Sequence, residues 1–152
     1  MSAIRLDFVS QDRLVFSGEV TEILAPGIDG QLGILPKHAP LMTVLAPGEV
    51  LVKREGQDDL YFAISGGWME VLPNQVTILA RTAERSDEID IKRAEAARAS
   101  AAELLASGVT REDRAGLELR LRRSQIRLRV GRRQHGWHGT TGPESDTTTR
   151  IE

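Results

Sequence analysis

Hydrophobic and polar residues alternate along three stretches in the first half of the chain. Ile4, Leu6 and Phe8 are separated by polar residues, and the same period of two recurs in "LYFAIS" (60–65) and "VTILAR" (76–81). Successive side chains of a β-strand point to opposite faces, so this period predicts half-buried strands. Turn-forming residues separate the stretches at 17–19, 25–27, 46–48, 55–59 and 73–74. Many short strands with frequent turns favour a β-sandwich or a small barrel.

From Asp87 onward the chain is dominated by Ala, Glu, Arg and Leu, which are strong helix formers. Apolar residues recur there at steps of three and four, which predicts a helix with a narrow stripe made mostly of alanine. The stripe consists of Ala94, Ala97, Ala101, Leu104 and Leu105. "SG" at 107–108 predicts the end of this helix, and "TRED" at 110–113 resembles the capping box of a second one. We therefore expect an antiparallel helical hairpin.

The second predicted helix carries a competing signal. "LELRLRR" and "IRLRV" alternate with a period of two, as a strand would, but their residue types favour a helix and β-branched residues are scarce. We predict a helix. Residues 131–152 are rich in Gly, Thr and Ser and have no apolar period, which predicts a disordered tail. The expected α+β organisation is a β domain (1–86), a helical hairpin (87–130) and this tail.

Composition excludes several classes of function. The 152 residues suit one ordinary domain or a small domain with an appendage, and the absence of cysteine excludes disulfides, thiolate nucleophiles and Cys-ligated zinc. No apolar run reaches the roughly 20 residues that cross a bilayer, and no signal-peptide core is visible, so we predict a soluble, cytoplasmic protein. Aromatic residues make up 4% of the chain, too few for a platform that stacks single-stranded nucleic acid.

Arginine is concentrated in "RLRRSQIRLRVGRR" (120–133). A charge run on a helix is often only a solvated face. The other interpretations are contact with an acidic protein surface and, with less weight, contact with phosphate, because guanidinium groups pair bidentately with both. Something anionic is therefore expected as a partner.

The loop "GIDGQLGILPKHAP" (27–40) lacks the spacing of a phosphate cradle, and prolines follow where a helix would be needed. Turns between strands are the first interpretation, and a surface loop that contacts a partner is the second. His38 lies in this loop, and His135 and His138 in the tail would at most chelate a metal weakly. No catalytic triad or acid pair in an apolar setting is visible, so we expect neither catalysis nor a specific metal site.

The stretch "IDIKRA" (89–94) stands where the strands give way to the helices. Asp90 would lie in the first helical turn, where a carboxylate is favoured by the free N–H groups. Arg93 follows three residues later, so an Asp90–Arg93 ion pair is the simple interpretation. The other interpretation is a binding site in which Arg93 meets a phosphate or carboxylate, with cationic support from the second helix.

Together these stretches resemble the epsilon subunits of the bacterial rotary ATP synthase. The similarity covers about residues 3 to 130 and rests on "FSGEV" (16–20), "GQLGILPKHAPL" (30–41), "SGGWMEVLPNQVTILA" (65–80), "AER" (83–85) and "IDIKRA". The resemblance implies an N-terminal antiparallel β-sandwich followed by a two-helix hairpin. It also implies a non-catalytic rotor part that binds the gamma subunit, sits on the ring of c subunits and couples proton-driven rotation to ATP synthesis. Such a subunit lies at the cytoplasmic face of the cell membrane and is held there only through the complex.

The resemblance also implies contact residues. Gln31, Lys37 and His38 would face the c ring, although family members often carry an acid where Gln31 stands. The family's hairpin either folds against the sandwich or extends into the catalytic head of alpha and beta subunits, where it inhibits ATP hydrolysis. In the extended state, four arginines of the second helix would face acidic segments of the beta subunits: Arg120, Arg122, Arg123 and Arg127.

In some relatives the folded hairpin binds ATP as a regulatory ligand. Carried over to this sequence, the site would comprise Glu84, Ile89, Asp90, Arg93, Ala94, Arg123 and Arg127. Ser100 stands where strong ATP binders carry an arginine, which leaves the affinity open. No cofactor is required, and we expect no nucleic-acid partner.

Two interpretations from other classes remain at this stage. A free-standing sandwich module with a basic helix would bind nucleic acid in a strongly salt-dependent way. A small jelly-roll enzyme that uses His38 would contain a metal.

Overall fold

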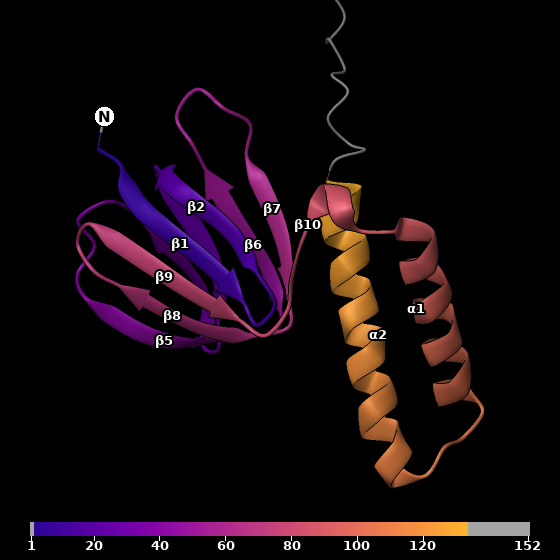
Figure 1. Cartoon of the computed structure of the whole chain (residues 1–152). Coiled ribbons are helices and arrows are strands. Elements are labelled where there is room, and N and C mark those ends of the chain that lie inside the picture. Colours follow the sequence, from indigo (N-terminus) through magenta and orange to yellow (C-terminus); the bar gives the residue numbers. More distant parts are fainter. Residues whose placement is uncertain (1, 134–152) are drawn as a thin grey trace, which may run out of the picture.

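The computed structural model of the chain describes residues 2–133, in which a β domain is followed by two packed helices (Figure 1). The β domain contains β1 (Ile4–Ser10), β2 (Leu14–Val20), β3 (Glu22–Gly27), β4 (Gly30–Ile34), β5 (Leu41–Leu45), β6 (Gly48–Lys53), β7 (Leu60–Ile64), β8 (Gly67–Val71), β9 (Gln75–Ala80) and β10 (Ala83–Arg85). A short 3-10 helix, η1 (Ser86–Glu88), leads to α1 (Ile91–Ala106) and α2 (Arg111–Arg132). The predicted α+β class is confirmed.

The strands follow the order β10-β7-β6-β3-β5-β8-β9-β1-β2, with β4 paired to β3. Although β1 and β7 are far apart in this order, the rings of Phe8 and Phe62 meet edge to face with their centroids 5.0 Å apart. The sheet therefore folds over on itself and encloses the core, as the predicted sandwich requires.

One strand pair departs from the antiparallel pattern. β1 runs parallel to β9, from Arg5 opposite Gln75 to Ser10 opposite Ala80, whereas the other ladders are antiparallel. A parallel pair needs a long connection between its strands. Here most of the β domain lies between β1 and β9 and supplies that connection.

The alternating pattern of the sequence corresponds to burial. Ile4, Leu6 and Phe8 are at most 1% exposed, and the residues between them are not buried. The three apolar positions predicted along β9 are also buried, and the residues between them are not. These side chains belong to a single cluster that also takes residues from β2 to β8, so the two-residue period is caused by one shared core.

The first helix ends where the sequence predicts but begins later: Ser86–Glu88 form η1, and Asp90 is the N-cap of α1 and not part of its first turn. Ser107 is the C-cap of α1, and Gly108 follows with a φ of 80°, a conformation that favours glycine. The hydroxyl of Thr110 accepts from the backbone N–H of Asp113 and donates to its carboxylate, which forms the predicted cap of α2. In α1, Ala94 and Ala101 are buried but Leu104 is 45% exposed, so the buried stripe is narrower than predicted.

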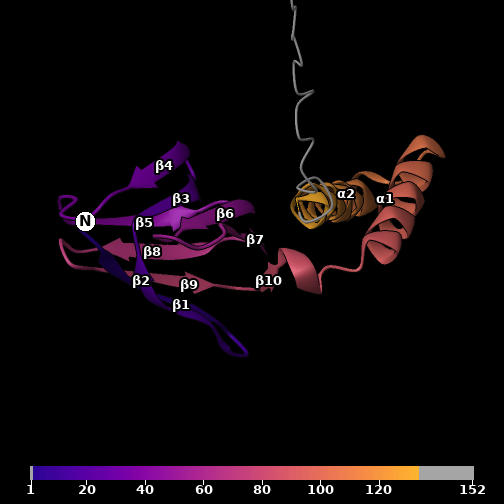
Figure 2. The ribbon, with the colours of Figure 1, turned by 90° about the horizontal axis from the view of Figure 1, so that it is seen from above.

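α2 lies between the sandwich and α1 (Figure 2), and this position explains the strand-like pattern of its sequence. Ile126 and Val130 pack against Ala63 and Ile89. Leu128 is also buried, but at 3.6 residues per turn it points to the opposite side of the helix. Because α2 is buried on two opposite faces, its apolar residues recur at every second position, as they would in a strand. α2 ends at Arg132 with Arg133 as its C-cap, so the first three residues of the predicted tail belong to the hairpin; residues 134–152 lie outside the described structure.

Candidate functional site

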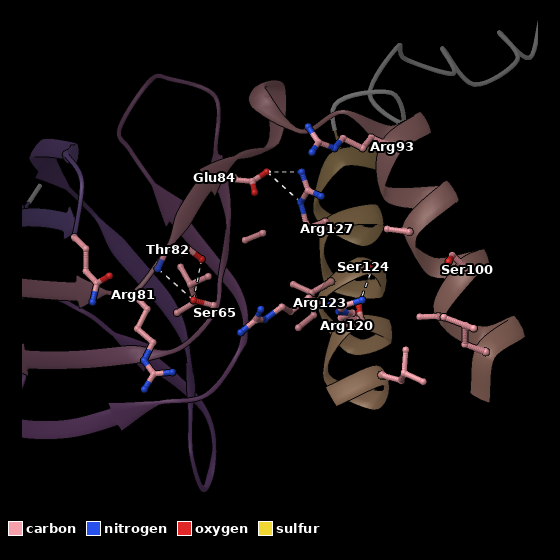
Figure 3. Close-up of a pocket in the computed structure, with 18 residues that line it drawn as sticks. Ser65, Arg81, Thr82, Glu84, Arg93, Ser100, Arg120, Arg123, Ser124 and Arg127 are labelled. Atoms are coloured by element: carbon pink, nitrogen blue, oxygen red, sulfur yellow. Dashed lines mark hydrogen bonds and ion pairs between the residues drawn. The ribbon is translucent and has the colours of Figure 1, made fainter. Parts of the chain in front are cut away.

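A cavity of about 710 Å³ lies between the sandwich and the hairpin. Its walls come from β7, the segment around β10, α1 and α2 (Figure 3). Four residues of the predicted nucleotide site line it: Glu84, Arg93, Arg123 and Arg127. They come from three elements separated by up to 43 positions in the sequence, and they share a surface only because α2 folds back to β7 and β10.

The cavity is strongly cationic. Five arginines line it, Arg81, Arg93, Arg120, Arg123 and Arg127, and Glu84 is the one acidic residue among the described lining residues. Glu84 accepts two hydrogen bonds from Arg127, at 3.2 and 3.1 Å, so Arg127 is held in place while the other four have no ion-pair partner within residues 2–133. Several fork-shaped guanidinium groups around one space suit a ligand with several phosphate oxygens.

The rest of the cavity is apolar or uncharged. Aliphatic side chains line part of it, among them Ile64, Ala97, Leu117 and Ile126. A surface of this kind accommodates the flat, weakly polar part of a ligand, whereas the arginines accommodate its charge.

Two cavity arginines were not predicted as part of a nucleotide site. Arg120 was expected to contact the beta subunits, and Arg81 was assigned no role. The spacing of Arg120, Arg123 and Arg127 at three and four residues is a signal that places all three on one helix face. Arg81 follows β9 directly, and no sequence pattern indicates that this turn faces α2.

The other three predicted residues, Ile89, Asp90 and Ala94, do not line the cavity. Ile89 is buried in the cluster that joins the hairpin to the sandwich, and Ala94 is fully buried. Asp90 is the N-cap of α1, and its carboxylate accepts from the backbone N–H of Arg93 at 3.1 Å. These residues set the start and the docking of α1, and so position Arg93.

The Asp90–Arg93 side-chain ion pair of the simple interpretation is not formed in the described structure. The carboxylate of an N-cap residue is directed at the free N–H groups of the first turn. The guanidinium of Arg93 instead faces the cavity, and no salt bridge joins it to Asp90. In this motif Asp90 therefore caps α1, whereas Arg93 lines the cavity.

The cap predicts a specific pattern of stability. Asp90→Ala lowers the free energy of unfolding by about 1 kcal/mol, because the N–H of Arg93 loses its acceptor. Asp90→Asn keeps the free energy of unfolding close to that of the wild type, since asparagine caps as well as aspartate. Urea unfolding followed by circular dichroism measures both. If Arg93→Ala costs as much as Asp90→Ala, a side-chain pair rather than the cap stabilises this turn.

Three ion pairs hold the hairpin and its linker against the sandwich. Besides Glu84–Arg127, Arg133 donates to Glu49 at 2.9 Å, and Arg13 donates to Glu88 at 2.6 Å. The hydrogen bond to Glu49 raises the pKa of Arg133, although desolvation acts in the opposite direction. Such partly exposed pairs contribute about 0–1 kcal/mol each.

Known proteins that are similar to this chain identify its family. Residues 3–86 match the family model described as ATP synthase, Delta/Epsilon chain, beta-sandwich domain. The ATP synthase epsilon chain of Herpetosiphon aurantiacus is 50% identical over 129 residues, which cover 85% of this chain and 94% of the relative. The chain belongs to the ATP synthase epsilon family. Its members are non-catalytic subunits, in agreement with the prediction from the sequence.

Two further comparisons extend this result for the epsilon family. The epsilon chain of Dehalococcoides mccartyi strain BAV1 is 45% identical over 138 residues, covering 89% of this chain and 98% of the relative. In the cryo-EM structure of the Euglena gracilis mitochondrial ATP synthase, one chain is 26% identical with a TM-score of 0.74, over 83% of this chain and 79% of that chain. The similarity includes the helices as well as the sandwich.

The residues that the epsilon resemblance assigns to the c ring lie on the β3–β4–β5 side of the sandwich. Gln31 is exposed on β4, and Lys37 is exposed in the loop that follows, with a φ of 65°. The Nδ1 of His38 lies 2.7 Å from the carbonyl oxygen of Ala39. Within residues 2–133, no three His, Asp or Glu side chains cluster as a metal site requires. His135 and His138 lie outside the described residues.

The helices that the structure describes show no membrane-spanning character. None of those in residues 2–133 is both long enough and apolar enough to cross a bilayer.

Proposed function

We propose that this epsilon subunit is a rotor part that couples rotation of the c ring to ATP synthesis and that its hairpin is a regulatory switch. Folded against the sandwich, the hairpin binds ATP in the cationic cavity. Extended, it reaches the alpha and beta subunits and inhibits ATP hydrolysis. The subunit acts at the cytoplasmic face of the cell membrane and is held there through the complex.

The observation that carries the proposal is the origin of the cavity arginines. Arg81 belongs to the sandwich, whereas Arg93 and Arg123 belong to the hairpin. Without an anion these like charges disfavour the folded arrangement, and a polyphosphate between them favours it. ATP thereby stabilises the folded hairpin, because it binds that state better than the extended one.

The docking of the hairpin is weak enough for a switch. The apolar cluster that joins it to the sandwich contains Ala63, Ile89, Ile126 and Val130, with Tyr61 against it. The ion pairs described above add little each. A partner that offers more buried surface is therefore able to compete for α2.

The same arginines serve both states in this proposal. Arg120, Arg123 and Arg127 line the cavity of the folded form, and Arg122 is exposed. In the extended form all four would face acidic segments of the beta subunits, where complementary charge strengthens docking. Because a side chain occupies one place at a time, ATP and the beta subunits compete for them.

The sandwich offers a surface for the gamma subunit. Met42, Trp68 and Leu79 are 65%, 55% and 53% exposed, and Val44 lies opposite Trp68 in the β5–β8 ladder. Trp68 in turn lies opposite Leu79 in the β8–β9 ladder. This apolar stripe (Met42, Val44, Trp68, Leu79) crosses three neighbouring strands, as a protein-binding face does. Gln31, Lys37 and His38 remain the proposed c-ring contacts.

The ATP site predicts the result of a titration of the isolated chain. ATP releases saturable heat with the wild type, and Arg93→Ala or Arg123→Ala weakens binding about tenfold or more, since each removes a charge-assisted contact of ~1.5–3 kcal/mol. Arg81→Ala weakens it in the same direction. Isothermal titration calorimetry measures all three.

Arg111→Ala is the matched control, because Arg111 lies at the start of α2 and outside the cavity. The Arg111→Ala variant should bind ATP with the affinity of the wild type. Equal affinities for all variants would remove the cavity from the proposal.

A further inference from the structure

A second hollow lies on the other side of α2. It has a volume of about 950 Å³ and is lined by Tyr61 of β7, Arg98 of α1, and Gln125, Leu128, Arg129, Arg132 and Arg133 at the C-terminal end of α2. At 3.6 residues per turn, Arg129 and Arg132 point away from the face that carries Arg123 and Arg127. The helix thus forms the floor of two separate hollows, each bounded by β7 on one side and α1 on the other.

Four arginines line the second hollow, and none of its lining residues within 2–133 is acidic. Two of the four arginines are held by acidic residues that do not line the hollow. Arg132 donates to Glu95 at 3.1 Å, and Arg133 donates to Glu49 at 2.9 Å while its guanidinium carbon lies 5.1 Å from the centre of the Tyr61 ring. These contacts orient the two guanidinium groups.

The other two arginines have no such contacts. Neither Arg98 nor Arg129 makes a side-chain hydrogen bond or an ion pair with any residue in the described range 2–133. They approach the hollow from different helices. Two oriented and two unpaired guanidinium groups around one space leave an excess of donors and of positive charge that this part of the chain does not neutralise.

We propose that this hollow is a second anion site, which binds small phosphorylated anions through Arg98 and Arg129. Phosphate is favoured because its tetrahedral oxygens accept from several guanidinium groups at different angles, as donors from two helices require. A carboxylate offers two oxygens in one plane, so it fits donors that approach from different helices less well than a phosphate does. The polar amide of Gln125 supplies a further donor beside the charges.

The position of the site gives it a structural effect. An anion held by Arg98 and Arg129 links α1 to α2. Arg133 contacts Glu49 and Tyr61 of the sandwich. The bound anion therefore lies beside the contact between the hairpin and the β domain. Binding there stabilises the folded hairpin by linkage, independently of any nucleotide in the first cavity.

Pyrophosphate titrated into the full-length chain tests the site. The experiment is done on a background of Arg93→Ala and Arg123→Ala, which weakens the first cavity. We expect saturable binding of one anion per chain, weakened about tenfold by Arg98→Gln or Arg129→Gln, the loss of one charge-assisted contact. The side-chain Nε–Hε resonances of Arg98 and Arg129 should shift on saturation. Arg111→Gln, in neither hollow, is the matched control and should bind as the background does.

The outcomes separate this inference from the proposed ATP site. If heat is absent, does not saturate, or is unchanged by Arg98→Gln and Arg129→Gln, there is no second site. If a short polyglutamate peptide binds at the same residues more tightly than pyrophosphate, the hollow is a docking place for acidic protein segments and the phosphate assignment is wrong. Failure of ATP to bind the wild-type cavity leaves this result untouched, because the residues differ.

Discussion

Gly67→Ala lowers the free energy of unfolding by about 3 kcal/mol or more, a cost at the upper end of that for overpacked positions. A Cβ at residue 67 would lie 2.1 Å from the carbonyl oxygen of Leu79 and 2.8 Å from the Cα of Ala80. These are backbone atoms of β9, which pairs with β8 directly at this point, Gly67 opposite Ala80. The clash is relieved only by moving one strand away from the other, and β9 also carries the parallel ladder to β1.

Gly116→Ala is the control for this experiment. Gly116 lies inside α2, and a Cβ there would meet no heavy atom of residues 2–133 within 4 Å apart from the backbone of its own helix. The substitution should raise stability by up to about 1 kcal/mol, because alanine is the better helix former. Chemical unfolding should show that the same Gly→Ala change lowers the free energy of unfolding at residue 67 and raises it at residue 116. A Gly67→Ala variant as stable as the wild type would show that β8 and β9 are not paired as described.

Removal of the hairpin abolishes inhibition of ATP hydrolysis while binding to the rotor is retained. Full-length protein added to a catalytic head that lacks this subunit should slow hydrolysis, and a chain that ends at Ser86 should leave the rate unchanged. The shortened chain keeps all ten strands and the complete sandwich core, which draws no residue from α1 or α2. It loses every arginine of α2, and with them the charges proposed to face the beta subunits.

Trp68→Asp separates binding from inhibition in this experiment. Trp68 is 55% exposed within the apolar stripe, so the substitution leaves the core intact while it places a charge in the proposed gamma contact. Both the full-length and the shortened chain should then fail to bind. If the shortened chain slows hydrolysis as much as the full-length chain does, the hairpin is not the inhibitory element, and the cavity arginines need another explanation.

The sequence predicted the elements correctly where the signal was local. Ile4, Leu6 and Phe8 repeat with a period of two and are buried, and Thr110 caps α2 as its spacing to Asp113 suggests. These features depend on residues within one turn or one strand, so their physical basis is visible in a short window. The position of α2 between two neighbours is not local, and for this reason its sequence resembles that of a strand.

The residues around the cavity were predicted in part. Arg93, Arg123 and Arg127 were named from the motif and lie around one cavity with Glu84, whereas Ile89, Asp90 and Ala94 support the start of α1 instead. The motif identifies residues that occur together, but it does not distinguish those that face a ligand from those that hold the backbone. Burial and the direction of each side chain make that distinction.

The sequence by itself determined the strand and helix periods, the cap at Thr110, the arginine content of the hairpin and the family. Only the tertiary structure decided which distant residues are in contact: the Glu84–Arg127 ion pair, Arg81 beside the cavity arginines of α2, and Tyr61 with Arg133. The physical reason is that local patterns arise from contacts within a few residues. The placement of α2 depends instead on a small apolar cluster assembled from β7, the linker before α1 and the end of α2.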